Sequence, residues 1–142
     1  MTMILVVDAN IIFSAIIKSG NTKFLLLLLD NELYSPDYFF EEFEKHLQEL
    51  CERTGLNEEQ IKQALETLIE IAGIKFVALE KFIPERELAK EISGDPNDAS
   101  YFGLAIFLNC PIWSNDKRLK KQNKVRIITT KELIEELNNE EN

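Results

Sequence analysis

Short apolar runs alternate along the chain with longer stretches in which apolar residues recur every three or four positions. The first pattern is typical of a buried strand and the second of an amphipathic helix. We predict strands at 4–7, 33–35, 74–79, 111–116 and 125–129, and helices at about 11–17, 23–30, 37–52, 57–73, 85–92, 99–108 and 129–137. Because strands and helices alternate, the sequence predicts the α/β class, with a parallel sheet covered by helices on both faces.

Two of the predicted strands end in a carboxylate. Asp8 follows the first apolar run and Asp116 follows the fourth. In open α/β sheets the ligand crevice lies outside the carboxyl ends of the strands, so these two acids would face a site. Two further acids, Glu42 and Asp98, lie where predicted helices begin. The four carboxylates are therefore expected to meet in one crevice.

Helix capping is an alternative explanation for the same acids. Asp and Asn side chains at a helix start accept hydrogen bonds from unpaired backbone N–H groups. Asp8 or Asn10 could do so for the helix that follows them, and Asp95 and Asp98 for the apolar helix that begins at Ala99. Acids in a first turn, such as Glu42, are also favoured by the helix dipole. The pattern alone leaves both explanations open.

Clustered carboxylates repel one another, and a hard divalent cation relieves that repulsion. Oxygen ligands favour Mg²⁺ or Mn²⁺ over zinc, which prefers His and Cys. The chain has one histidine, His46, and two cysteines, Cys51 and Cys110, without metal-binding spacing. A surface position is favoured for His46, although it lies one helical turn after Glu42. No glycine-rich phosphate loop and no nucleophile elbow is present.

Composition indicates one globular domain with an unusual charge distribution. Of the 142 residues, 45% are hydrophobic and 29% charged, and the net charge of −9 argues against binding nucleic acid through bulk electrostatics. Six of the 16 basic residues nevertheless fall within residues 117–126, a window that equally suits a solvated face. We expect a cytoplasmic protein with reduced thiols, no signal peptide and no membrane association.

Four segments together resemble the PIN-domain nucleases. They are Asp8-Ala-Asn10 after the first strand, Phe40-Glu-Glu-Phe43, Asp95-Pro-Asn-Asp98-Ala99 before an apolar helix, and Ile112-Trp-Ser-Asn-Asp116. The resemblance covers nearly the whole chain and is closest to the small single-domain proteins, which include toxins of toxin–antitoxin pairs. It implies a three-layer α/β/α sandwich with a five-stranded parallel sheet over residues 1–137, followed by a polar tail at 138–142.

The resemblance also implies an endoribonuclease that uses Mg²⁺ or Mn²⁺. Its catalytic acids would be Asp8, Glu42, Asp98 and Asp116, of which Asp8, Asp98 and Asp116 hold the metal. Glu42 would ligate through water or orient the attacking water, and Glu41 is the alternative at that position. Asn10, Asp95 and Ser114 would support the cluster, with Ser114 standing where the family often has Thr. Lys117 and Arg118, next to Asp116, would contact the RNA.

The implied partners are an RNA substrate, an antitoxin protein and a second copy of the chain. The apolar run Phe24–Leu29 would supply either a dimer interface or part of the core. One alternative function is a PIN-like module that binds RNA or protein without cleaving. A phosphohydrolase or receiver domain also places Asp after its first strand, but Asn10 stands where the phosphohydrolases have a second Asp.

Overall fold

A computed structural model describes residues 3–28 and 32–141, with side chains as far as residue 139. Within these ranges one sheet has the strand order β3-β2-β1-β4-β5, and all its strands are parallel. The strands are β1 (Ile4–Val7), β2 (Glu32–Pro36), β3 (Lys75–Val77), β4 (Ile112–Trp113) and β5 (Ile127–Ile128). The predicted five-stranded parallel sheet is confirmed, with β1 at its centre.

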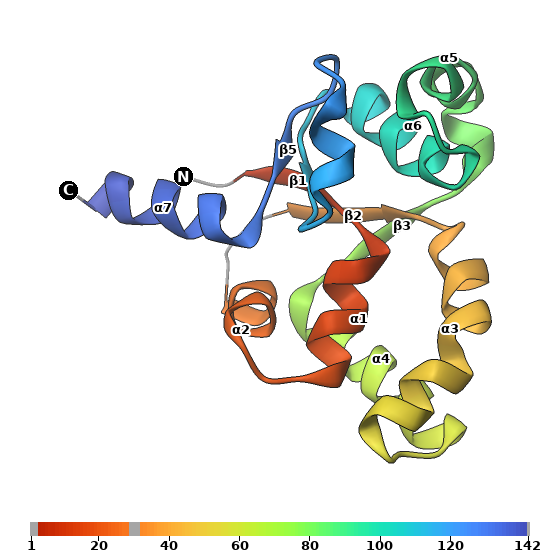
Figure 1. Cartoon of the computed structure of the whole chain (residues 1–142), viewed down its shortest axis with the longest axis vertical. Helices are drawn as coiled ribbons and strands as arrows, with labels where there is room; N and C mark the ends of the chain where they lie inside the picture. Colours follow the sequence, from red (N-terminus) through yellow and green to blue (C-terminus); the bar gives the residue numbers. More distant parts are fainter. Residues whose placement is uncertain (1–2, 29–31, 142) are drawn as a thin grey trace.

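Helices cover both faces of the sheet (Figure 1). On one face lie α5 (Ile83–Ser93) and α6 (Ala99–Leu108). On the other lie α1 (Ala9–Ile17), α2 (Asn21–Leu28), α3 (Phe39–Thr54) and α4 (Glu58–Ala72), and α7 (Thr130–Glu141) lies beside α2. Short 3-10 helices span Leu79–Lys81, Pro96–Asp98 and Lys117–Lys121. This is the predicted three-layer α/β/α arrangement.

The most deeply buried helix is α6, which begins at the carboxyl edge of the sheet. Its residues from Ala99 to Ala105 are all buried, as expected for a helix that is apolar on nearly every face. Gly103 permits its close packing against α5, because a Cβ at this position would lie 2.7 Å from the Cα of Arg86. Helix α6 also packs against β1 and β2, and this packing fixes where the acid before the helix lies relative to the sheet.

Several element boundaries differ from the sequence prediction. The first helix begins at Ala9, directly after Asp8, and leaves no loop between β1 and α1. Strand β2 continues through Pro36 at its end, and the next N–H, that of Asp37, donates to Val77. Helix α7 continues to Glu141, past Leu137, since polar residues without Gly or Pro do not stop a helix. The predicted helix at 23–30 is α2, and residues 29–30 lie outside the described residues.

The apolar run in α2 is divided between core and surface. Leu25 and Leu26 are buried, whereas Phe24 and Leu28 are 62% and 64% exposed, and Leu29 lies outside the described residues. A homodimer stays a prediction.

In the part of the chain that the structure describes, no single helix is long and apolar enough to span a membrane. Helices α1 and α2 reach the required length and hydropathy only when they are taken together, and the chain bends between them by 109°.

We expect Gly103→Ala to destabilise the protein by about 1 kcal/mol. The added methyl group would overlap backbone atoms of α5, which cannot move aside as a side chain can, and overpacking of this kind costs about 1–3 kcal/mol. The higher helix propensity of Ala would offset about 1 kcal/mol. Urea denaturation measures the difference. Gly20→Ala is the control, since a Cβ there meets nothing within 4 Å; an equal effect of the two substitutions would contradict the packing argument.

Candidate functional site

Asp8 and Ser114 join the ends of the two central strands. Asp8 follows β1 and is 9% exposed, and Ser114 follows β4 and is fully buried. The Ser114 hydroxyl donates to Asp8 Oδ2 at 2.7 Å and accepts from the Asp116 N–H at 3.0 Å. Asp8 occupies the N-cap position of α1, but its side chain makes no capping hydrogen bond. The capping explanation is therefore wrong for this carboxylate, which bonds across the sheet instead.

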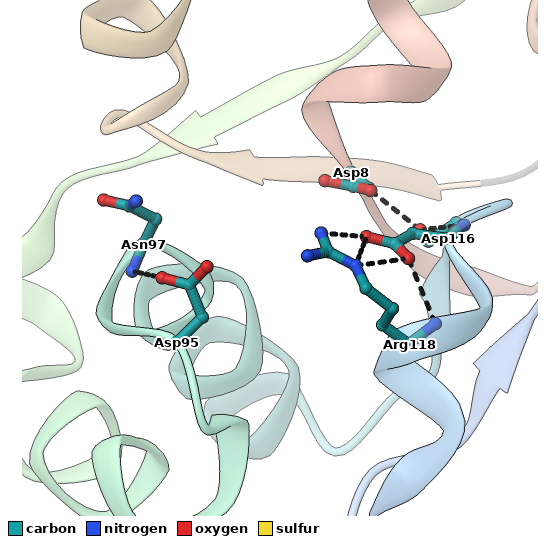
Figure 2. A network of polar contacts seen from close by, with 6 residues as sticks. Asp8, Asp95, Asn97, Asp116 and Arg118 are labelled. Carbon is teal, nitrogen blue, oxygen red and sulfur yellow. Dashed lines mark hydrogen bonds and ion pairs between the residues drawn. The ribbon is translucent and has the colours of Figure 1, made fainter.

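Of the two acids before α6, Asp95 caps a helix with its side chain and Asp98 does not. Asp95 accepts a hydrogen bond from the Asn97 N–H at 2.9 Å and so caps the 3-10 turn that precedes the helix (Figure 2). Asp98 stands at the N-cap of α6 without a side-chain capping bond. Capping accounts for Asp95 and leaves Asp98 free for another role.

Glu42 reaches the same region from α3. Its side chain is half-buried, and its Oε1 accepts a hydrogen bond of 2.5 Å from the hydroxyl of Tyr101. The neighbouring Glu41 is exposed. The sequence analysis missed Tyr101, although its position three residues after Asp98 places both side chains on one face of the helix. Burial, followed by the charge of Glu42, raises the pKa of Tyr101, so its hydroxyl stays a proton donor at neutral pH.

Asp116 is held by the segment that follows it. It accepts from the Arg118 N–H at 3.0 Å, and its Oδ2 lies 2.7 Å from Nη2 of the Arg118 guanidinium. Figure 2 shows this guanidinium against Asp116, close to Asp8, with Asp95 across from it. The hydrogen bonds from Arg118 lower the pKa of Asp116. The residue predicted to contact RNA therefore lies at the site, where it neutralises one of the acids.

The basic window at 117–126 is partly neutralised by other acids as well. Lys120 pairs with Glu132 and Arg126 pairs with Glu136, both on α7. The Lys120 ammonium lowers the pKa of Glu132 to about 2. Counting Arg118, three of the six basic side chains form salt bridges within the described residues. Ion pairing inside the fold therefore explains part of a charge cluster that the sequence alone could assign to RNA.

Burial is the main cause of the raised pKa values of Asp8, Asp98 and Glu42, and neighbouring acids add to it. Burial raises the pKa of Asp8 to about 6, and the charges of Glu42 and Asp116 contribute. Burial also raises the pKa of Asp98 to about 6, with contributions from Asp95 and Asp8. The pKa of Glu42 is raised by burial and by Asp98, against the lowering effect of the Tyr101 hydrogen bond.

The donor set fits a hard divalent cation in its chemistry. All four predicted acids supply carboxylate oxygens, the ligands that Mg²⁺ and Mn²⁺ prefer. The pKa values of Asp8 and Asp98 are raised mainly by burial and further by neighbouring acids, and a bound cation would favour the ionised form of both carboxyls. Among the residues that the structure describes, no group of three or more such side chains converges on one point that could hold an ion. Asp8, Glu42 and Asp116 are instead each held by a protein partner.

Comparison with known protein families identifies the fold of this chain. The family model described as PIN domain matches residues 6–138, which include every predicted site residue. The chain belongs to the PIN-domain family. Two curated relatives are the "VapC ribonuclease Mb0985" of Mycobacterium bovis and the "Ribonuclease VapC9" of Mycobacterium tuberculosis. Each is 29% identical over 115 residues, which are 81% of this chain and 87% of the relative.

Solved structures of PIN-domain proteins share the fold. VapBC2 from Rickettsia felis, bound to a DNA fragment from its promoter, aligns with a TM-score of 0.68 at 16% identity over 89% of this chain and 98% of the other. VapBC-1 from nontypeable Haemophilus influenzae aligns with a TM-score of 0.58 at 20% identity over 91% and 99%. Both likenesses show the PIN fold over nearly the full length of the matched chains.

We expect Asp8→Asn to stabilise the metal-free protein at pH 8 by about 1–3 kcal/mol. The pKa of Asp8 is about 6 in the folded protein, above its ordinary value of 3.8. Its protonated form therefore favours folding, and this contribution is lost as the pH rises through about 6. Urea denaturation in chelator at pH 4 and pH 8 would show the gain chiefly at the higher pH.

The control for this measurement is Glu41→Gln, a substitution at an exposed acid on α3. It should change the free energy of unfolding by no more than about 0.5 kcal/mol. If Asp8→Asn were strongly destabilising at pH 8, the ionised carboxylate would be a stabilising group and the repulsive cluster would be excluded.

We expect Tyr101→Phe to destabilise the protein by about 1–2 kcal/mol at neutral pH, since hydrogen bonds to charged groups contribute about 1.5–3 kcal/mol and Glu42 is only half-buried. The loss should shrink at acid pH, where the Glu42 carboxyl is protonated. Tyr38→Phe is the matched control, because its hydroxyl donates to Asn97 at an exposed position. Equal losses at both pH values would assign the effect to packing.

Proposed function

We propose that this protein is a metal-dependent endoribonuclease that hydrolyses RNA phosphodiester bonds. The observation that supports this most directly is the position of Asp8, which is buried at the end of the central strand of a PIN-domain sheet and bonds to Ser114 across that sheet instead of capping α1. Burial of an ionised carboxylate near other acids costs stability, and a divalent cation would compensate for that cost. The names of the curated relatives, which call them ribonucleases, agree with this proposal.

Each site residue has a distinct role in the proposal. Asp8, Asp98 and Asp116 would hold Mg²⁺ or Mn²⁺. The bound ion would lower the pKa of a water molecule and stabilise negative charge on the scissile phosphate. Glu42, fixed by the Tyr101 hydroxyl, would orient the attacking water. Ser114 would keep Asp8 in place through its 2.7 Å hydrogen bond.

Other residues would assist from the edges of the site. Asp95 shapes the turn that presents Asp98, and Asn10 lies exposed on the first turn of α1. Arg118 would exchange its bond with Asp116 for a bond with a substrate phosphate when a metal takes the carboxylate. The Arg118 side chain is 73% exposed, so solvent screens its ion pair with Asp116 and the exchange costs little. Lys117, also exposed, would contact the same backbone.

The proposed biological setting is a toxin held in check by an antitoxin protein. The solved neighbours are described as VapBC structures, and the curated relatives carry VapC names. A toxin that cuts RNA would act in the cytoplasm, where its substrate is, and the exposed Phe24 and Leu28 offer apolar surface for a homodimer. The second candidate is a PIN module that binds without cleaving. It is less well supported, because it has no physical need for mutually repelling acids.

We expect the protein to cleave labelled single-stranded RNA with Mg²⁺ or Mn²⁺, and chelator to abolish the cleavage. Asp98→Asn and Glu42→Gln should each lower the rate by at least about a hundredfold, since even residues outside the metal's ligand shell typically contribute 10–100-fold. Glu41→Gln is the matched control for Glu42→Gln and should keep nearly full activity, because its side chain is exposed.

A thermal melt with and without Mg²⁺ separates metal binding from cleavage. Ligand binding to the folded state raises the melting temperature of the wild type, and this shift should be absent in Asp98→Asn. A shift without RNA cleavage would support the metal site and point to a selective substrate. Neither shift nor cleavage would contradict the proposed enzyme and favour the binding module.

A further inference from the structure

A cleft between α1 and α3 has no role in the site described so far. Its volume is about 320 Å³, and its lining includes Asn10, Lys18, His46 and Arg53. It follows α1 from its first turn to the residue just past its end, a distance of about 12 Å at 1.5 Å per residue. Figure 1 shows α1 and α3 descending together from the carboxyl edge of the sheet.

The cleft begins at the acids. Asn10 lies two residues after Asp8, and His46 lies one helical turn after Glu42. Side chains one turn apart on a helix are neighbours, so His46 lies next to Glu42 on α3. A chain whose scissile phosphate lies at the acids can therefore continue directly into the cleft.

Cations outnumber anions along the cleft, although the protein as a whole carries a net charge of −9. Lys18 lies just past the end of α1 and Arg53 in the last turn of α3, and both are exposed. Glu49 also lines the cleft, where it accepts a hydrogen bond or forms an ion pair with Nδ1 of His46 at 3.2 Å. The two fixed positive charges suit a ligand that carries repeated negative charges.

An aromatic surface lies between the acids and the two cations. The His46 ring packs on Phe13 with its centroid 5.2 Å away, and the His46 side chain remains 45% exposed. Sites for single-stranded nucleic acid combine a basic groove along the backbone with aromatic rings on which bases stack. The cleft has both components, in the order acid cluster, ring, cations.

We propose that the cleft between α1 and α3 is a subsite for the single-stranded RNA next to the scissile bond. Lys18 and Arg53 contact its phosphates, and the His46 ring stacks on a base. This inference rests on the proposed ribonuclease function and adds a second basic contact zone. The segment Lys117–Lys121 lies on the α6 side of the sheet and the cleft on the α1 side, so RNA crossing the acids meets cations on both sides (Figure 1).

The test is the salt dependence of RNA binding in an Asp98→Asn background, in which the substrate stays intact. A fluorescently labelled single-stranded RNA of mixed sequence is titrated by anisotropy at salt concentrations from about 50 to 200 mM. Each lost phosphate contact lowers the slope of log K against log salt by about 0.7 for a single strand, so Lys18→Ala with Arg53→Ala should lower it by about 1.4. His46→Ala should weaken binding at least about fivefold with little change in slope.

The matched control is Lys62→Ala with Lys81→Ala, which removes the same charge from exposed positions that do not line the cleft. It should leave the slope nearly unchanged. Equal effects of the two double variants would mean that only net charge matters, and an unchanged slope in Lys18→Ala with Arg53→Ala would place the RNA elsewhere. Either result overturns the inference and leaves the proposed function intact as long as the wild type cleaves RNA. Absence of both binding and cleavage overturns the two together.

Discussion

A carboxylate buried at the centre of the sheet constrains the rest of this site. Asp8 ends the central strand, and α1 begins at the next residue, so the backbone cannot carry the acid out to solvent. The Ser114 hydroxyl donates a hydrogen bond to the Asp8 carboxylate and at the same time accepts one from the Asp116 N–H. The relative position of the two strand-end acids is therefore set by one buried hydroxyl, whose loss would leave two polar groups without a partner.

Two of the other acids are also each held by one protein side chain. Tyr101 holds Glu42 and Arg118 holds Asp116. These partners satisfy each of these carboxylates separately, and among the described residues no group of three or more ligating side chains could hold an ion. Arg118, the partner of Asp116, has a side chain that is 73% exposed, whereas Ser114, the partner of Asp8, is fully buried. The site is thus rigid at the Asp8 end and adaptable at the Asp116 end.

Sequence reasoning reached the fold, and the ends of the strands and helices at which the acids stand, because both follow from local patterns. The apolar run before Asp8 and the apolar helix after Asp98 each admit few positions in a parallel α/β sheet. It could not tell which of Asp95 and Asp98 caps a helix with its side chain, since capping depends on the backbone angles of one turn. It also missed Tyr101, because a tyrosine in an apolar helix looks like core until α3 brings Glu42 to its hydroxyl.

Charge was the hardest property to interpret from the sequence, and the structure shows why. Residues 117–126 look uniformly basic, yet Lys120 and Arg126 are paired with α7. Lys18 and Arg53 are 35 positions apart and attract no attention in the sequence, yet the packing of α1 on α3 brings them to one cleft beside the acids. Electrostatic attraction falls off with distance and is screened by salt, so a polyanion responds to the charges near its path more than to the net charge of −9. An acidic protein can therefore offer RNA a locally basic path, provided that the fold and not the sequence gathers the cations.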